Sequence, residues 1–589
     1  MVRPNGKSEK PRDAKGTLRR LLDCLMGRRA ALGVILVLSL GGNILSLLGP
    51  KLAGTAMGAA AAGKGLVDFG LVYRCAWAML ACCLGSSAVT FAVNFGMMRI
   101  GRLTARKLRS DVFHKLLELP VSFFDGHQAG DIISRVSYDV DVVGTCISAD
   151  LSPILTSLVT VAGSFVMMAV ISPVLTAVTL VTIPMAIGYT RRMNRVTKPL
   201  FSRRSAAYGG MNGFAEEKFS GLATIQSYAR EEQTARRFAA INDDAADAYY
   251  QATRTAKRMG PNVRFINDLG LALIAILGSL LYMRGYIGLD QISAFVLYSR
   301  KFSGPINEIA SITGEIYAAL AAAERVFHLL DTPGEPADLP AAEPLTDVGG
   351  DISLEKVSFG YTPEQDILRE VSLHARPGQM VAIVGPTGAG KTTIINLLMR
   401  FYDFQEGRGA VDGRDMRALT RSSLRRSYAM VLQDTWLFQG TVCENIAYGR
   451  EGATREDVIA AAKAARIHGA IMQLPQGYDT VLYEDGGNIS KGQKQLLTIA
   501  RAMLYDAKML ILDEATSNVD TATERQIQTA MRELMARKTC VVIAHRLSTI
   551  QNADHILVVD QGRVAEQGRH RELMERRGTY YRLYAAQFE

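Results

Sequence analysis

Residues 385–392 read GPTGAGKT, a glycine-rich run that ends in a lysine and a threonine. The apolar run MVAIV precedes it and the helical pattern TIINLLMR follows, so we expect a loop between a strand and a helix. Such glycines let backbone N–H groups close around phosphate oxygens at a helix N-terminus. The sequence therefore predicts a nucleotide phosphate site, with a positive charge from Lys391 on the outer phosphates and magnesium on the Thr392 hydroxyl. Its residues are Gly385, Pro386, Thr387, Gly388, Ala389, Gly390, Lys391, Thr392 and Thr393.

Two carboxylates, Asp513 and Glu514, end the apolar run MLILD and begin the turn that follows it. In a phosphate site one carboxylate can hold magnesium, and the next can orient or deprotonate an attacking water. His545 ends another apolar run, TCVVIA, where it could contact a terminal phosphate. Taken singly, a charged strand end or a lone histidine is more often structural. Beside the glycine-rich run, they predict hydrolysis of a nucleoside triphosphate.

The elements that must position these residues follow residue 350. Short β-rich runs alternate there with helical stretches, which predicts an α/β domain with a mainly parallel sheet. Residues 331–350 are rich in Pro, Gly and Asp and lack apolar periodicity, so they are interpreted as an interdomain linker.

The first half of the chain contains long stretches without charged residues. Residues 30–50 would form a helix about 30 Å long, enough to cross the core of a bilayer. Further spans are predicted at 75–98, at 151–190 as two helices broken near Ser172 and Pro173, at 269–283, and at 291–323. Six spans would place both ends of the membrane domain on one side.

The net charge of +10 at pH 7 is explained by where the basic residues lie. They gather in the segments after the second and fourth spans: Arg99, Arg102, Arg106, Lys107, Arg109 and Lys115, then Arg191 and Arg192. By the positive-inside rule, these segments, the N-terminus and the second half are cytoplasmic. We therefore expect no nucleic-acid partner. The seven cysteines show no paired spacing, so neither a disulfide framework nor a metal site is indicated.

The motifs of the second half together resemble the nucleotide-binding domain of ABC transporters over nearly all of residues 352–589. The resemblance includes Tyr361, which in the family stacks on adenine, and Gln433, which contacts magnesium, water and the membrane domain. It implies ATP and Mg2+ as ligands. It also implies catalytic roles for Glu514, His545 and Gln433, and magnesium contacts from Thr392, Gln433 and Asp513.

The run NISKGQKQ is similar to the signature motif of the family, LSGGQ, with Ser490, Gly492 and Gln493 in place. The run SNVD, ending at Asp520, matches the loop that crosses between subunits. In the family the signature of one domain completes the ATP site of another. The resemblance therefore implies a dimer in which ATP binding closes the two domains and hydrolysis reopens them, which drives alternating access of the membrane helices.

Two inner segments of the membrane half also resemble ABC exporters. Residues 119–141 match the coupling region of the family, and residues 212–232 match its second inner loop, which docks on the ATPase domain of the partner. The matching positions are Phe123, Phe124, Asp125, Gly130 and Arg135 in the first, and Glu216, Glu217 and Gly221 in the second.

We therefore expect an exporter-type half-transporter, an α-helical membrane domain with six transmembrane helices fused to an α/β P-loop NTPase domain of ABC type. The expected division is an N-terminal cytoplasmic segment at 1–27, the membrane domain at 28–330, the linker at 331–350 and the ATPase domain at 351–589. A bacterial inner membrane is expected, because no organellar transit pattern is present.

The resemblance implies ATP-driven export of a hydrophobic or amphipathic compound, a drug or a lipid. Three alternatives stay open at this point. The same scaffold could import a siderophore-like cargo, the chain could be an ATP-regulated channel, or it could be a soluble ABC ATPase acting on DNA or the ribosome. The apolar spans argue against the last of these.

The signature departs from the family pattern at its third position, where Lys491 replaces a glycine. The variant could be tolerated in a homodimer, or the chain could pair with a second half-transporter in a heterodimer with one weak site. We favour the heterodimer, because heterodimeric exporters often combine an intact catalytic glutamate, as in Glu514, with an altered signature.

Two cationic residues, Arg300 and Lys301, fall inside the sixth predicted span, where a charge is costly unless it faces water or a counter-charge. They could line the cargo pathway and favour anionic or polar groups. Equally, they could pair with acidic residues on a neighbouring helix or lie close to the membrane interface.

Overall fold

The computed structural model describes residues 13–61, 67–362, 365–433, 435–483, 486–513, 521–544 and 547–588. The chain divides into two compact units, of which the first comprises Met1–Leu119 and His127–Pro333 and the second Pro120–Gly126 and Gly334–Glu589. The finer four-part division expected from the sequence stays a prediction.

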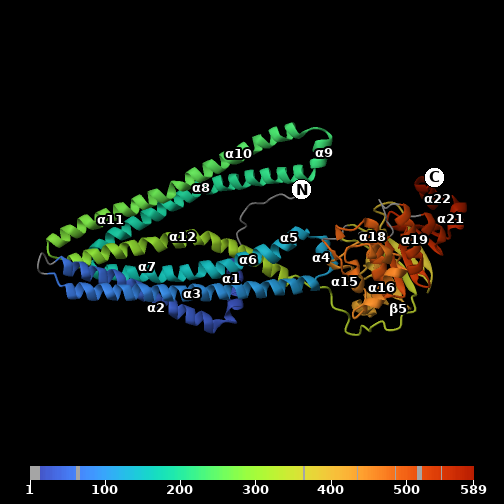
Figure 1. Cartoon of the computed structure of the whole chain (residues 1–589), viewed down its shortest axis with the longest axis horizontal. Coiled ribbons are helices and arrows are strands. Elements are labelled where there is room, and N and C mark those ends of the chain that lie inside the picture. The colour runs from blue at the N-terminus through green and yellow to red at the C-terminus, as the bar shows by residue number, and fades with distance from the viewer. Residues whose placement is uncertain are drawn as a thin grey trace. The chain divides into compact units, whose positions relative to one another are not determined.

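The first unit is helical throughout its described residues (Figure 1). Its elements are α1 (Ala14–Met26), α2 (Arg29–Ala60), α3 (Phe69–Glu118), α5 (Ala129–Ser134), α6 (Val140–Thr145), α7 (Leu151–Ile171), α8 (Pro173–Ser220), α9 (Leu222–Ser227), α10 (Glu231–Lys257), α11 (Met259–Met283) and α12 (Leu289–Asp331), with π-helical turns at Arg135–Asp139 and Cys146–Asp150.

Five helical segments of the described chain are long and apolar enough to cross a membrane: Arg29–Ala60, Phe69–Glu118, Ala129–Ile171, Pro173–Ser220 and Glu231–Met283. The predicted break between the third and fourth spans is confirmed at Ser172, whose hydroxyl accepts a hydrogen bond from the Leu175 N–H at 3.4 Å. Pro173 then begins α8, because proline is tolerated in the first turn of a helix.

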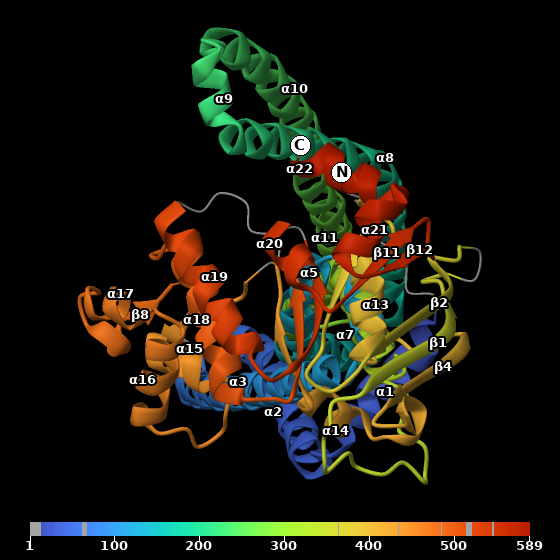
Figure 2. The same ribbon diagram turned by 90° about the vertical axis from the view of Figure 1, so that its right-hand side faces the viewer.

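The sixth predicted span lies within α12, which is 43 residues long and packs against α2 and α7. Arg300, Lys301 and Glu308 interrupt its apolar run, so α12 does not join the five segments selected by length and apolarity. In Figures 1 and 2, α8 runs out to α9, and α10 and α11 run back, so that the three long helices form a hairpin. The end of this hairpin at α9 lies apart from the other long helices of the unit, which are α2, α3, α7 and α12.

The second unit contains a six-stranded sheet and a four-stranded antiparallel sheet. The strand order is β12-β11-β3-β10-β9-β6 in the larger sheet and β2-β1-β4-β5 in the smaller, and β7 pairs with β8. The strands are β1 (Ile352–Phe359), β2 (Leu368–Ala375), β3 (Met380–Val384), β4 (Glu406–Val411), β5 (Arg414–Asp415), β6 (Tyr428–Val431), β7 (Gly440–Thr441), β8 (Val481–Leu482), β9 (Met509–Asp513), β10 (Thr539–Ile543), β11 (His555–Asp560) and β12 (Arg563–Gly568).

Every neighbouring pair in the larger sheet is parallel except β11 and β12, which confirms the expected mainly parallel α/β domain. The helices of the unit are α4 (Val121–Asp125), α13 (Lys391–Leu398), α14 (Arg421–Arg426), α15 (Val442–Ala447), α16 (Arg455–Ala464), α17 (His468–Met472), α18 (Lys491–Tyr505), α19 (Thr521–Met535), α20 (Leu547–Asn552), α21 (His570–Arg576) and α22 (Thr579–Phe588).

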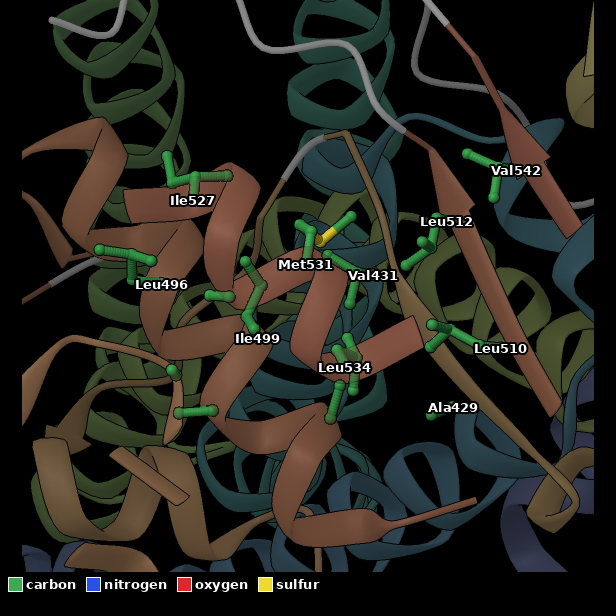
Figure 3. Close-up of a cluster of buried hydrophobic side chains, with 14 of the residues drawn as sticks. Ala429, Val431, Leu496, Ile499, Leu510, Leu512, Ile527, Met531, Leu534 and Val542 are labelled. Carbon is green, nitrogen blue, oxygen red and sulfur yellow. The ribbon is translucent and has the colours of Figure 1, made fainter. Parts of the chain in front are cut away.

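Both faces of the larger sheet are buried, which explains why its strands are apolar without alternation. Along β9, Leu510 and Leu512 join a core that α18 and α19 cover (Figure 3), whereas Met509 and Ile511 join a second core with α13 and the smaller sheet. In Figure 2, α18 and α19 lie side by side. The ends of these strands are therefore held rigidly.

A cluster of ion pairs around Arg421 connects Glu335 and Asp338, near the start of the second unit, to Asp403. The Arg421 side chain is only 8% exposed, and its Nη2 lies 2.5 Å from Asp403 Oδ2. Its other contacts come from the predicted linker, with Asp338 Oδ1 3.3 Å from Nη1 and Glu335 Oε1 3.7 Å from Nε. Without Arg421, the carboxylates of Asp338, Asp403 and Glu335 would have only Arg400 and Arg425, among the described residues, as counter-charges.

We therefore expect Arg421→Ala to destabilise the second unit by about 3 kcal/mol, because three partly buried carboxylates would lose one of their three buried or half-buried counter-charges. Arg414→Ala is the matched control, since that side chain is 52% exposed and 3.9 Å from Glu343. It should change stability by less than about 0.5 kcal/mol. Thermal unfolding of the purified variants measures both, and equal melting temperatures would contradict this role for the cluster.

Candidate functional site

The glycine-rich run between β3 and α13 forms a tight loop that side chains could not fill. Gly390 caps α13 with φ 101°, and a Cβ there would lie 2.6 Å from Leu368 Cδ2. A Cβ at Gly385 would lie 2.1 Å from the carbonyl oxygen of Val559. Glycine is required at both positions for these reasons. The loop thus presents backbone N–H groups at the start of α13, where an anion is stabilised.

The Lys391 side chain lies along this loop and is 8% exposed. Its Nζ donates hydrogen bonds to the carbonyl oxygens of Gly385 and Pro386 at 2.7 and 2.9 Å. Burial lowers the pKa of Lys391, and the negative charge of Asp513 opposes that shift. A phosphate anion in the loop would likewise favour the charged ammonium. Thr392, the next residue, is exposed at the helix start.

Four parallel strands bring the predicted motifs to one edge of the larger sheet. Ile383 of β3 pairs with Ile543 of β10, which in turn pairs with Asp513 of β9. Val431 of β6 pairs with Leu512, so the exposed Gln433 follows the strand next to β9. Asp513 therefore ends a strand, and Gly385 and Gln433 follow strands, at the same edge of the sheet. Glu514, His545 and Asp520 lie outside the described residues.

Tyr361 is held beside the start of α13. Its ring makes edge-to-face contacts with Phe359 and Tyr402 at centroid distances of 5.1 and 5.0 Å. Its hydroxyl lies 3.2 Å from Thr393 Oγ1 and accepts a hydrogen bond from Asn396 Nδ2 at 3.1 Å. Because the residue is nevertheless 46% exposed, it offers an aromatic surface next to the phosphate loop.

The signature residues begin α18, a helix of 15 residues. Ser490 caps it: its Oγ accepts from the Gln493 N–H at 3.2 Å, and Gln493 Oε1 accepts from the Ser490 N–H at 3.0 Å. Gly492 is buried, whereas Lys491 is exposed at the first helical position. A ligand that approaches this helix N-terminus would therefore meet the Lys491 side chain.

The two units correspond to two known families. The ABC transporter transmembrane region matches residues 32–306, and the ABC transporter family matches residues 368–517. A fatty acid ABC transporter ATP-binding/permease protein of Mycobacterium bovis is 44% identical over 529 residues, which is 89% of this chain and 83% of that protein. The chain belongs to the ABC transporter family.

Two further relatives indicate the type of ABC transporter. An ATP-dependent lipid A-core flippase of Methylobacillus flagellatus is 37% identical over 504 residues, 85% of each chain. A solved bacterial Atm1-family ABC exporter with ATP bound is 30% identical with a TM-score of 0.77, and the match covers 98% of this chain and 99% of that one. This ABC transporter is thus an ATP-hydrolysing, exporter-type half-transporter that is embedded in the membrane and dimerises.

Each predicted coupling segment of the ABC transporter contains a short helix with exposed aromatic residues, α4 in the first and α9 in the second. Phe123 and Phe124 lie edge to face in α4 at a centroid distance of 5.5 Å, and the Tyr402 hydroxyl donates a hydrogen bond to Asp125 in the same unit. Burial raises the pKa of Tyr402, and the bond to Asp125 adds to the shift. At the other segment, Phe219 and Tyr228 flank α9 and are 76% and 74% exposed.

The remaining coupling positions lie on other helices of the first unit. Gly130 is in α5, and Arg135 begins the π-helical turn that follows it. Glu216 and Glu217 end α8, where Glu217 Oε1 lies 2.6 Å from Lys218 Nζ, and Gly221 separates α8 from α9.

Arg300 and Lys301 differ in their surroundings although they are adjacent in α12. Arg300 is exposed, whereas Lys301 Nζ donates hydrogen bonds to the carbonyl oxygen of Ser46 at 2.5 Å and to Ser46 Oγ at 2.6 Å. Their role in a cargo pathway stays a prediction.

Sequence reasoning missed Tyr402, Asn396 and Glu308. Tyr402 and Asn396 contact Tyr361 only through the tertiary fold, so no local pattern signals them. Glu308 could have been identified as a candidate functional residue from the sequence, because it is an acidic residue inside a predicted membrane span.

Proposed function

We propose that this transporter exports a hydrophobic or amphipathic compound, with lipids as the leading class, by alternating access powered by ATP. The observation that carries the proposal is a nucleotide site at one sheet edge in the same chain as five apolar spans. Relatives named for fatty acids and for the lipid A core, at 44% and 37% identity, support lipids as the cargo class.

In the proposed nucleotide site, each residue has a separate role in binding or hydrolysing ATP. Tyr361 would stack on adenine, and Lys391 with the loop N–H groups would bind the phosphates. Thr392, Asp513 and Gln433 would hold Mg2+, which when bound neutralises charge on the phosphates; all three supply oxygen atoms, as magnesium prefers. Glu514 would deprotonate or orient the attacking water, and His545 would contact the terminal phosphate.

The same site would be completed by a second half-transporter. In the proposed closed dimer, Ser490, Gly492 and Gln493 contact the nucleotide of the partner, and Asp520 contributes to the loop between subunits. The exposed Lys491 supports a heterodimer, because its side chain would crowd the γ-phosphate at the helix N-terminus. The exposed aromatic residues at α9 support docking of that turn on the ATPase domain of the partner.

The membrane placement follows from charge. Basic residues of the inner segments and the N-terminus favour a cytoplasmic location for these parts and for the ATPase domain. We place the transporter in a bacterial inner membrane with several spans. Arg300, which is exposed in α12, would line the cargo pathway.

Transport of labelled lipid in vesicles of known orientation tests this function. With ATP supplied to the side that exposes the ATPase domain, we expect a fluorescent fatty acid or phospholipid to move to the opposite leaflet or lumen. The mutant Lys391→Ala in the same vesicles is the control for passive movement. Accumulation on the ATPase side would instead favour the importer alternative, and currents without ATP turnover would favour a channel.

A further inference from the structure

A polar cavity lies between α2, α3, α7 and α12 inside the first unit. Its volume is about 280 Å³. The described lining residues are four serines, three threonines, two asparagines and Glu308, together with two valines, one proline and one glycine. On α2 the lining begins at Ser39, ten residues after the helix starts, which is about 15 Å along the axis. The cavity is therefore within the apolar part of the span, where polar groups are costly unless they serve a function.

Four of the seven described hydroxyl groups that line this cavity donate their protons within the protein, and two of these donate to backbone carbonyl oxygens, Ser86 to Cys83 at 3.1 Å and Thr90 to Ser86 at 2.8 Å. Thr160 Oγ1 donates to Asn43 Oδ1 at 2.9 Å, and Ser157 Oγ, just outside the lining, donates to Glu308 Oε2 at 3.0 Å. Ser152 Oγ donates to Asn94 Oδ1 at 3.3 Å. Each hydroxyl has one proton but two acceptor lone pairs. The groups that face the cavity are consequently richer in acceptors than in donors.

The charge at the cavity, like its excess of hydrogen-bond acceptors, favours a cationic ligand. Among the described lining residues Glu308 alone is charged, and it is exposed. Lys301, seven residues before Glu308 on α12, donates two of its three N–H groups to Ser46, which is one of the lining residues. A guest with a positive charge and several N–H donors would complement both the carboxylate and the acceptors.

We propose that this cavity binds the primary ammonium group of an amphiphile, with Glu308 as its counter-charge. The proposal rests on the proposed export function and deepens it, because it names a chemical class that neither relative is named for. At about 280 Å³ the cavity is smaller than typical sites for whole drug-sized ligands, so it receives a head group and leaves the acyl chains outside.

The residues that line the cavity should bind a primary ammonium group more tightly than a quaternary ammonium group. Quaternary ammonium groups have no N–H and are recognised by aromatic faces, and none of the lining residues that the structure describes is aromatic. A primary ammonium has three N–H donors, which Glu308, the asparagine Oδ1 atoms and the hydroxyl oxygens can accept. We therefore expect an ethanolamine head group to bind and a choline head group to be rejected.

Lipid binding to the full chain, measured by native mass spectrometry, tests the proposal without requiring ATP hydrolysis. The probes are phosphatidylethanolamine and phosphatidylcholine with identical acyl chains. The wild-type chain should bind the ethanolamine lipid about tenfold more tightly, since charge-assisted hydrogen bonds are the strong ones. Glu308→Gln, which keeps the shape but removes the charge, should reduce this preference to near onefold.

Two further variants keep the test decisive. Asp290→Asn removes an acid near the first residue of the same helix, far from Glu308 in the chain, and should keep the wild-type preference. Glu308→Asp keeps the charge and should keep most of the preference, which covers the case in which Glu308→Gln does not fold. Equal binding of the two lipids by the wild-type chain, or a preference that survives in Glu308→Gln, would overturn the proposal.

A competition arm distinguishes the source of the ammonium group. If soluble ethanolamine displaces the bound lipid and choline does not, a free amine suffices; if neither displaces it while the lipid preference holds, the site requires the membrane lipid. Either result supports the ammonium site. Mg-ATP hydrolysis in the absence of these lipids is measured separately, so a failure of the proposed function is recognised independently of a failure of the cavity proposal.

Discussion

Lys391→Ala is expected to lower Mg-ATP hydrolysis by at least about 100-fold, because it removes the charge that stabilises the outer phosphates. In the structure Lys391 is 8% exposed and bonded to the loop carbonyls of Gly385 and Pro386, so it is already positioned at the phosphate loop. The rate is measured on the chain in lipid together with its partner, if one is required.

The matched control for this change is Lys463→Ala. Lys463 is an exposed lysine in the last turn of α16, away from every predicted nucleotide contact. It should leave the rate of hydrolysis unchanged. Retention of more than a tenth of the rate in Lys391→Ala would contradict the role given to the phosphate loop.

Glu514→Gln is expected to reduce hydrolysis by about 100-fold or more while ATP binding persists, because it removes the proposed base but keeps the size of the side chain. The mutant should retain Mg-ATP in a closed dimer, which gel filtration of the chain with labelled nucleotide detects. Glu451→Gln, an exposed acid in the same unit, is the control and should hydrolyse normally. Loss of ATP binding in Glu514→Gln would indicate a structural role instead.

The nucleotide site was predictable because its parts are local in sequence. The run 385–392 was recognisable from the spacing of its glycines, lysine and threonine alone, although the atoms that leave no room for a Cβ at Gly385 and Gly390 belong to the distant Val559 and Leu368. The apolar strands that end at Asp513 and before Gln433 were also visible, and parallel pairing then brings their ends together. Likewise, Ser172 and Pro173 signal a helix break by themselves.

The features that escaped prediction depend on contacts between distant segments. Tyr402 lies 277 residues from Asp125, and no pattern near either residue predicts their hydrogen bond. The polar cavity draws single serines, threonines and asparagines from four helices, each of which is unremarkable in its own apolar run.

The central claim is that ATP hydrolysis at a site shared by two chains drives this transporter. Mg-ATP hydrolysis by the purified chain in lipid, as wild type and as Lys491→Gly, with and without Glu514→Gln, tests it most directly. We expect low activity in the wild type, clearly higher activity in Lys491→Gly, and none with Glu514→Gln in either background. Hydrolysis that survives Glu514→Gln, or a folded Lys491→Gly chain that binds ATP and never hydrolyses it, would contradict the claim.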